Sequence, residues 1–255
     1  MLYQKSHGAG KPLYLLHGWA LNSRVWDPVV DQLKHQWQVT TIDLPGHGKS
    51  SPPTSGTYNI DVLAEEVSCA IDKPATLIGW SLGGMVAQNL AQKYPELVEK
   101  LVLVASSPQF AASKDWPCAV KQSVIDGFTR DLIKDYRSTI LRFLAIQTLG
   151  SEQAKAVVGE LREKVFINGE PHLDSLTQGL SILKNTDLRA RIQKIHCPTL
   201  IIVGEKDTLI PVCSGQQTRS LIRNSQLAII KGAGHAPFIS HTAEFINILE
   251  QFLTP

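Results

Sequence analysis

The stretch Gly79-Trp80-Ser81-Leu82-Gly83 decides the fold predicted for this chain. It has the pattern G-x-S-x-G, with a strand-like run at 75–78 before it and a helix-like run at 85–93 after it. A serine on a sharp turn between a strand and a helix projects its hydroxyl out of the sheet, where a substrate can reach it. The two glycines permit the crowded turn, because a Cβ at either position would collide with the neighbouring strand or helix. This context predicts a nucleophilic serine, provided that an acid and a base follow it.

Length and composition fit one α/β domain with room for an inserted lid. The chain has 255 residues, of which 43% are hydrophobic and 19% are charged, and these fractions are ordinary for a globular protein. The net charge of +2 is too balanced to indicate a nucleic acid or an anionic membrane surface as a partner. No apolar run approaches the roughly 18 residues that a membrane span needs, and the first residues lack the apolar core of a signal peptide. We expect a cytoplasmic, monomeric protein with no nucleic-acid partner and no membrane partner.

The four cysteines are widely scattered along the chain, at Cys69, Cys118, Cys197 and Cys213. Such spacing favours free thiols in a reducing compartment over disulfides or zinc ligands. No cluster of histidines, cysteines and carboxylates has the spacing of a metal site either. The sequence therefore predicts no metal and no cofactor.

One motif imitates a phosphate-binding loop. Gly46-His47-Gly48-Lys49-Ser50 contains a Gly-Lys-Ser run, but the full pattern needs a glycine five positions before Gly48. That position is Asp43, so nucleotide binding is rejected.

Six short apolar runs alternate with helix-length stretches, which is typical of a parallel sheet covered by helices. The predicted strands are 12–16, 38–42, 75–78, 101–105, 199–203 and 225–230, and a closing helix is predicted at 242–252. Each apolar run ends in a loop of small and polar residues. In an open parallel sheet the loops at the carboxyl ends of the strands build the site.

The strand pattern is interrupted between Ser107 and about Leu188. Four helices are predicted there instead, at 118–134, 135–148, 151–165 and 172–184. Such a block is most simply a helical cap over the site. An independent second domain is the alternative, but the core pattern resumes directly afterwards and no linker-like composition separates the parts. The predicted domains are a core of residues 1–108 and 189–255, and an inserted cap of residues 109–188.

A serine hydroxyl is a poor nucleophile near neutral pH and needs a histidine base, which a carboxylate orients. In one recurrent arrangement the acid and then the histidine follow the serine along the chain. Asp207 and His235 each follow a predicted strand, and His235 lies in a glycine-rich loop. We therefore predict Ser81, Asp207 and His235 as the catalytic residues. Glu205 is an alternative acid, and capping a helix is an alternative role for Asp207.

Acyl transfer also requires donors aimed at the developing oxyanion, and the loss of one typically costs about 2.7–4 kcal/mol of barrier. Leu82, directly after the serine, offers a backbone N–H at the start of a helix. The second donor should come from the loop after an early strand. His17-Gly18-Trp19 lies in such a loop and makes the Trp19 N–H the candidate, with a simple turn as the alternative.

These motifs together resemble the α/β-hydrolase superfamily, which implies a mostly parallel central sheet flanked by helices. They are spread over nearly the whole chain, at 17–19, 43–50, 79–84, 204–207 and 234–235. A narrower set of stretches resembles the BioH family, the pimeloyl-[acyl-carrier protein] methyl ester esterases of biotin synthesis. This set comprises 15–19, 79–84, 104–108, 142–148 and 235–241. The stretch 142–148 is the most telling, because caps vary most among these hydrolases.

The resemblance implies a reaction and a set of substrate contacts. The methyl ester of a carrier-bound pimeloyl chain is cleaved, which releases methanol and leaves a free carboxylate on the acyl group. The implied residues around the oxyanion pocket are Trp19 and Leu82. Those implied along the acyl channel are Phe143, Leu144, Ala145, Ile146 and Gln147. From the residues alone, this apolar stretch is equally compatible with a helix core.

The implied partner is an acyl-carrier protein, which is acidic, so basic residues are expected on the cap. The candidates are Arg137, Arg142 and Lys155, with Arg162 and Lys164 beside them. Residues 110–185 contain ten lysines and arginines against nine aspartates and glutamates, a net charge of +1. Composition therefore does not support a basic patch, and only clustering on one face could create one.

Other activities fit the same scaffold. A broad carboxylesterase for short small-molecule esters, a thioesterase and a carbon–carbon bond hydrolase all use such a serine. Enzymes of this fold with an aspartate nucleophile are disfavoured, because Ser81 occupies that position. A receptor that retains the hydrolase fold and senses a small molecule is a rival of another class, and an intact triad argues against it.

Overall fold

A seven-stranded sheet forms the centre of the computed structural model, which describes residues 1–53, 56–148 and 153–254. The strand order is β1-β3-β2-β4-β5-β6-β7. β1 pairs antiparallel with β3, and the other strands are parallel to one another. The strands are β1 (Gln4–His7), β2 (Lys11–Leu16), β3 (Trp37–Ile42), β4 (Ala75–Trp80), β5 (Val98–Val104), β6 (Thr199–Gly204) and β7 (Ser225–Ile230).

Burial explains which strands could be predicted from the sequence. Every residue of β4 and β6 is buried, as expected for strands that helices cover on both faces and that consist of continuous apolar runs. The six predicted strands are present, and each predicted end lies within three residues of the observed end. β1, with the sequence Gln-Lys-Ser-His, was not predicted, because an exposed edge strand has no apolar signal.

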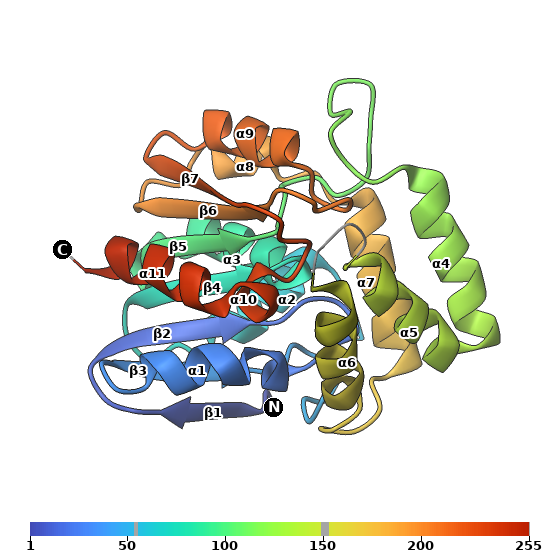
Figure 1. Ribbon diagram of the computed structural model, residues 1–255, viewed down its shortest axis with the longest axis horizontal. Helices are drawn as coiled ribbons and strands as arrows, with labels where there is room; N and C mark the ends of the chain where they lie inside the picture. Colours follow the sequence, from blue (N-terminus) through green and yellow to red (C-terminus); the bar gives the residue numbers. More distant parts are fainter. Residues whose placement is uncertain (54–55, 149–152, 255) are drawn as a thin grey trace.

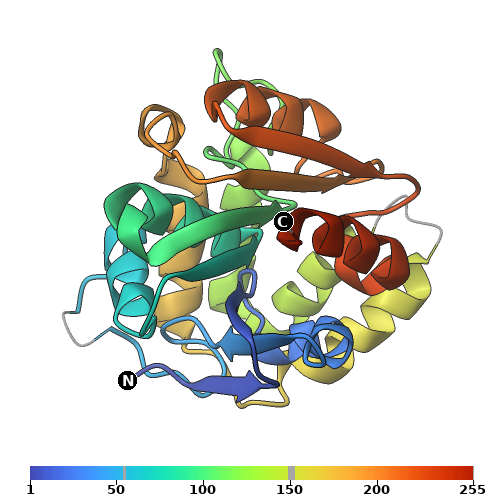
Figure 2. The ribbon, with the colours of Figure 1, turned by 90° about the vertical axis from the view of Figure 1, so that its left-hand side faces the viewer.

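Helices cover both faces of the sheet, as Figure 2 shows. On one face α1 contacts α11, and on the other face α3 contacts α2 and α8, which in turn contacts α9. These helices are α1 (Asp27–Leu33), α2 (Ile60–Ser68), α3 (Leu82–Lys93), α8 (Arg189–Ile192), α9 (Val212–Leu221), α10 (Pro237–Ser240) and α11 (Thr242–Leu253). No helix in the described ranges is long and apolar enough to cross a membrane.

Four further helices lie together beyond the carboxyl ends of the strands (Figure 1). We call residues 109–188, which contain them, the helical insertion. The two ends of this insertion are joined by an antiparallel β-bridge between Gln109 and Asp187, and by a hydrogen bond from the Leu188 N–H to the Pro108 carbonyl. The helices are α4 (Gln122–Lys134), α5 (Tyr136–Ile146), α6 (Ala154–Val165) and α7 (Leu173–Asn185).

Polar contacts tie the α6–α7 side of the insertion to the core. Asn22 Nδ2 donates to the carbonyls of Lys164 and Val165, at 2.9 and 3.2 Å. His172 N–H donates to the Gly46 carbonyl at 3.1 Å. The Asn22 amide thus holds the last turn of α6 against the loop after β2. This side of the insertion is therefore fixed to the loops that follow β2 and β3.

The helical predictions for the insertion hold with two adjustments. The first predicted helix begins at Gln122 rather than at 118, because the preceding residues form an irregular loop. The third was predicted from 151, and residues 151–152 lie outside the described ranges. The other boundaries agree within three residues.

The prediction of four free thiols is wrong. Cys118 and Cys213 form a disulfide, with their Cα atoms 5.9 Å apart and 95 residues apart in the chain. The loop before α4 folds back onto the start of α9, and this proximity has no signature in the spacing of the cysteines. Cys69 and Cys197 are free. The disulfide joins the helical insertion covalently to the core.

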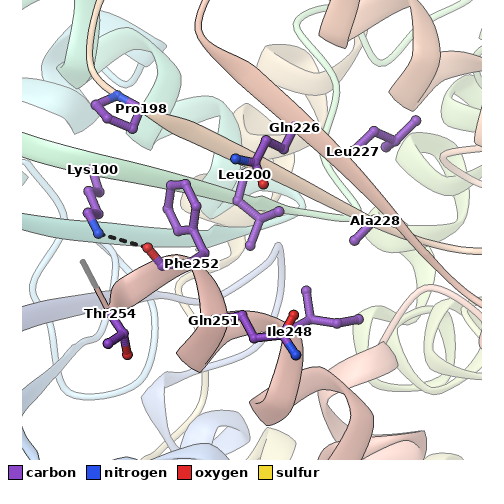
Figure 3. A pocket seen from close by; sticks show the side chains of 10 residues that line it. All are labelled: Lys100, Pro198, Leu200, Gln226, Leu227, Ala228, Ile248, Gln251, Phe252 and Thr254. Atoms are coloured by element: carbon purple, nitrogen blue, oxygen red, sulfur yellow. Dashed lines mark hydrogen bonds between the residues drawn. The ribbon is translucent and has the colours of Figure 1, made fainter.

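A cavity of about 610 Å³ lies under α11 at the amino ends of β5, β6 and β7, as Figure 3 shows. Its walls are largely apolar, and Lys100 donates from Nζ to the carbonyls of Phe252 and Leu253 at 2.7 and 2.9 Å. The lysine thus satisfies carbonyls at the end of α11. The cavity is at the end of the sheet opposite to Ser81, so we do not regard it as the active site.

We predict that Cys118→Ser lowers the free energy of unfolding by about 2–4 kcal/mol when no reductant is present, because the unfolded chain gains conformational freedom. Urea unfolding measures this change, and the mass of the alkylated protein reports the number of free thiols. Cys69→Ser is the matched control, since Cys69 is exposed and unpaired. Equal stability of the two variants would contradict the disulfide.

Candidate active site

Ser81 lies on the tight turn between β4 and α3, as the pentapeptide predicts. Its backbone has φ 55° and ψ −117°, which is a strained conformation for a residue with a Cβ and costs about 1–3 kcal/mol. The turn is held by hydrogen bonds from Ser81 N–H to the Val104 carbonyl, and from Gly84 and Met85 N–H to the Ser81 carbonyl. Only 3% of the serine is exposed, so a substrate reaches its hydroxyl only when neighbouring residues that cover the serine move.

The glycines on either side of the serine are required by close backbone approach. A Cβ on Gly79 would lie 2.5 Å from the Gly83 carbonyl oxygen, and one on Gly83 would lie 2.5 Å from the His17 carbonyl oxygen. Both distances are too short for a carbon to occupy. The missing side chain of Gly79 lets α3 lie directly on β4, and that of Gly83 lets α3 lie against the loop after β2, which carries Trp19.

His235 and Asp207 meet through a hydrogen bond at the carboxyl ends of β6 and β7. His235 Nδ1 lies 2.8 Å from Asp207 Oδ2, and both side chains are almost fully buried. The other carboxylate oxygen accepts the N–H groups of Leu209 and Ile210, at 2.8 and 2.9 Å. The carboxylate is therefore fully engaged and orients the imidazole with Nδ1 as donor.

The alternative acid, Glu205, faces elsewhere. Its Oε2 accepts the Gly232 N–H at 3.1 Å and lies 3.6 Å from Lys206 Nζ. The hydrogen bond from Gly232 lowers the pKa of this exposed carboxyl, with Lys206 adding to the effect. Asp207 rather than Glu205 is the carboxylate on His235.

The main chain of His235 is held on both sides. Its N–H donates to the Gln147 carbonyl at 2.9 Å, and its carbonyl accepts the indole N–H of Trp80 at 2.8 Å. Its Nε2 is buried and has no hydrogen-bond partner among the described residues. One ring nitrogen is thus free to accept a proton, although it forms no hydrogen bond with Ser81 in this closed arrangement.

The loop after β2 places the Trp19 backbone next to the serine turn. A Cβ on Gly18 would lie 3.2 Å from the Ser81 Cβ. Among the backbone hydrogen bonds of the described turns, loops and caps, none has the N–H of Trp19 or of Leu82 as its donor. Two donors are therefore available beside Ser81, which is the requirement for stabilising an oxyanion.

The Trp19 side chain connects this loop to the helical insertion. Its indole N–H donates to the Leu176 carbonyl at 2.8 Å, and its ring meets Phe143 edge-on, with centroids 4.9 Å apart. Gly179 of α7 lies against the same indole, since a Cβ there would be 2.7 Å from it. Trp19 is 1% exposed and is locked between core and insertion.

Two buried histidines support the loops around the serine. His17 Nε2 accepts the Leu44 N–H at 2.9 Å, and its ring centroid lies 5.4 Å from that of His47. Burial lowers the pKa of His17, with Asp43 partly opposing the shift. Burial and then the neighbouring His17 lower the pKa of His47 to about 3. Both are neutral structural residues near pH 7.

The α5 residues predicted for the acyl channel divide into two groups. Phe143 and Gln147 contact site residues, through the Trp19 ring and the His235 N–H respectively. The Oε1 atom of Gln147 is also buried without a partner among the described residues. Leu144 is fully buried, and Ala145 and Ile146 are partly buried. For these three, a role in substrate binding stays a prediction.

The basic residues predicted for carrier docking are partly neutralised. Arg137 pairs with Glu170 and its guanidinium lies over the Phe166 ring. Arg142 pairs with Asp131 and lies over the Phe128 ring. Lys155, the third candidate, is exposed on α6. Of the two others considered, Lys164 pairs with Glu160 and Arg162 is exposed.

Sequence reasoning missed two aromatic neighbours of His235. Trp80 contacts the histidine through its indole N–H, and the Phe110 ring lies edge-on to the imidazole with centroids 6.5 Å apart. Trp80 occupies a variable position of the quoted pentapeptide. A signal was present, because the N–H of a buried tryptophan usually has an acceptor.

The chain matches a known protein family over most of its length. A family model described as "alpha/beta hydrolase fold" matches residues 11–242. The pimeloyl-[acyl-carrier protein] methyl ester esterase of Pseudoalteromonas atlantica is 39% identical over 254 residues, which cover 99% of this chain and 98% of that protein. The protein of the same name from Aeromonas hydrophila is 40% identical over 246 residues, which cover 96% of each chain.

Solved structures with the same fold include two that cover this whole chain. The esterase EaEST from Exiguobacterium antarcticum superposes with a TM-score of 0.92 at 24% identity, over 96% of its own chain. A bromoperoxidase from Bacillus anthracis superposes with a TM-score of 0.91 at 28% identity, over 95% of its chain. The likeness to the esterase shows the fold alone.

We predict that acid destabilises the protein through the two buried histidines. In the unfolded chain they bind protons below about pH 6.5, whereas the folded protein keeps them neutral, with a pKa of about 3 for His47. Stability is therefore complete above about pH 6.5 and falls as the pH decreases toward 3, by up to about 1.4 kcal/mol per pH unit for each histidine. Urea unfolding between about pH 7 and about pH 5 measures the slope. His47→Gln should reduce this slope, and an unchanged slope would refute the assignment.

Proposed function

Because this chain belongs to the α/β-hydrolase family, and within it to the pimeloyl-[acyl-carrier protein] methyl ester esterases, we propose that it is a serine carboxylesterase of biotin synthesis. It hydrolyses the methyl ester of pimeloyl-[acyl-carrier protein] to pimeloyl-[acyl-carrier protein] and methanol. The observation that carries the proposal is the buried hydrogen bond between Asp207 and His235, 2.8 Å long, beside the strained serine turn. A base oriented in this way is what a serine nucleophile needs.

In the proposed first step, His235 Nε2 takes the hydroxyl proton of Ser81 as the serine oxygen attacks the ester carbonyl. The negative charge on the carbonyl oxygen is received by the N–H groups of Trp19 and Leu82. The tetrahedral intermediate then collapses, and its bond to the methoxy oxygen breaks. That oxygen takes the proton from His235 and leaves as methanol, so that an acyl-serine remains.

In the second step, water gives a proton to His235 while its oxygen attacks the acyl-serine. The bond to the serine oxygen breaks, Ser81 recovers its proton, and the carboxylic acid is released. Asp207 remains ionised throughout and stabilises the imidazolium that forms twice in the cycle. The hydrogen bonds from Leu209 and Ile210 support this role, because donors to a carboxylate stabilise its charged form.

We further propose that the helical insertion, residues 109–188, is the lid of the core formed by residues 1–108 and 189–255. Ser81 is 3% exposed, so the ester reaches it only when part of the insertion moves. The α6–α7 side is hydrogen-bonded to the core through Asn22 and His172. We assign the acyl chain to the space beside Phe143 and Gln147.

For the carrier protein we propose docking on α4 as well as at Arg137, Arg142 and Lys155. Arg130 and Lys134 are exposed on α4 and form no ion pair with any described residue. Ile133 lies between them and is 68% exposed. Unpaired cations around an exposed apolar side chain suit an acidic carrier surface, whereas the charges of Arg137 and Arg142 are offset by their partners.

A cytoplasmic location remains a prediction of the sequence. The Cys118–Cys213 disulfide opposes it, because cytosolic reductants keep most thiols reduced. The activity itself does not depend on the answer, since no cysteine takes part in the proposed steps.

We predict that Ser81→Ala reduces hydrolysis of methyl pimeloyl-carrier protein by about 10⁴-fold or more, because the nucleophile is lost. Methanol release and the mass of the carrier-bound product measure the reaction, and a short p-nitrophenyl ester is the second substrate. If the wild-type protein cleaves the short ester rapidly and ignores the carrier-bound ester, it is a general carboxylesterase. If the Ser81 variant retains substantial activity, the assignment of the nucleophile is wrong.

We also predict that the double variant Arg130→Glu, Lys134→Glu raises KM for the carrier-bound ester by about 5-fold to 10-fold, through loss of charge attraction. Its kcat on a free short ester should not change. Lys11→Glu with Lys73→Glu is the matched control, because it changes the charge equally on exposed residues at the amino ends of β2 and β4. Equal effects of the two double variants would place the carrier elsewhere.

A further inference from the structure

We propose that Trp80 is a positioning residue, whose indole N–H fixes the main chain of His235 at the distance from Ser81 that proton transfer requires. This inference rests on the proposed serine esterase mechanism. It assigns a function to a residue that does not touch the reacting atoms. The role follows from where Trp80 lies in the chain and from what its side chain contacts.

The contact between Trp80 and His235 joins two distant parts of the chain. Trp80 Nε1 donates to the His235 carbonyl at 2.8 Å, across 155 residues of sequence. The indole also lies against the imidazole, with ring centroids 5.7 Å apart. Trp80 is fully buried, so no water competes for this hydrogen bond. The Phe238 ring is a further neighbour, with ring centroids 5.0 Å apart.

Trp80 is also fixed with respect to the nucleophile and to the loop of the oxyanion donor. It is the last residue of β4 and directly precedes Ser81. A Cβ on Gly18, the neighbour of Trp19, would lie 3.2 Å from the Trp80 ring. One side chain therefore contacts the base loop and the oxyanion loop while its backbone continues into the nucleophile.

The hydrogen bond completes the restraints on the histidine. Asp207 orients the ring, and the Gln147 carbonyl holds the N–H of His235. Trp80 holds the carbonyl of the same residue. Without this donor a buried carbonyl has no partner, which is costly enough to shift the loop. A shift of about 1 Å between base and nucleophile reduces the rate by about 100-fold.

Trp26 provides a matched comparison within the same aromatic cluster. It is as fully buried as Trp80 and stacks on the same Phe238, with ring centroids 4.3 Å apart. Its indole N–H has no hydrogen-bond partner among the described residues. Replacing either tryptophan by phenylalanine removes similar apolar area, but only the change at Trp80 removes a hydrogen bond to His235.

The test compares Trp80→Phe with Trp26→Phe on methyl pimeloyl-carrier protein and on a short p-nitrophenyl ester. We expect the melting temperature to decrease more for Trp80→Phe than for Trp26→Phe, because only the change at Trp80 leaves a buried carbonyl without a partner, so kcat is measured at a temperature at which both variants are folded. For Trp80→Phe we expect kcat to decrease by about 10-fold to 100-fold on both substrates, with KM within about twofold of the wild type. For Trp26→Phe we expect kcat to stay close to that of the wild type.

A second variant covers the case in which Trp80→Phe does not fold. Benzothienylalanine at position 80, introduced by suppression of a stop codon, keeps the shape of the indole and removes its N–H. The same kcat loss is expected from it. Equal kcat values for the variants at positions 80 and 26, or a change in KM alone, would overturn the role of Trp80. A wild-type protein without esterase activity would instead overturn the proposed function, so the two failures are distinguishable.

Discussion

The close approach of α3 to the loop after β2 is the constraint on which the rest of the site depends. Gly83 leaves no room for a Cβ between α3 and this loop, and Gly79 leaves none between β4 and α3. The strain at Ser81 is maintained because β4 before it and residues 82–91 of α3 after it are buried. A turn held in this way places a hydroxyl and the free N–H groups of Trp19 and Leu82 at one point.

The parallel topology of the sheet, and not a local motif, places the other two groups of the proposed site. Asp207 and His235 come from loops after β6 and β7, which end at the same edge of the sheet as β4. The proposed acid, base and nucleophile are therefore brought together by strand order, although Ser81 and Asp207 are 126 positions apart in the sequence. Local hydrogen bonds, such as those from Leu209 and Ile210 to Asp207, then fix the side chains.

Much of this arrangement could be predicted from the sequence, because it has local signals. Buried strands such as β6 are continuous apolar runs, and the glycines around Ser81 mark the turn. β1 could not be predicted, because its polar residues lie at an exposed edge. The Cys118–Cys213 disulfide, the pairing of Arg142 with Asp131 and the contact of Trp80 with His235 depend on which distant segments meet. A single sequence, considered without an alignment, does not show which distant segments are in contact.

The hydrogen bond from the His235 N–H to the Gln147 carbonyl bears on whether the helical insertion can be exchanged independently of the core. In a hydrolase of this architecture, an inserted lid invites exchange as a unit, because it covers the substrate site and joins the core through two adjacent segments. Here the proposed lid also holds the main chain of His235, the proposed base, and its Leu176 carbonyl accepts the indole N–H of Trp19. A transplanted lid would change turnover together with substrate preference, so selectivity in this protein is better redesigned by single side chains than by grafting.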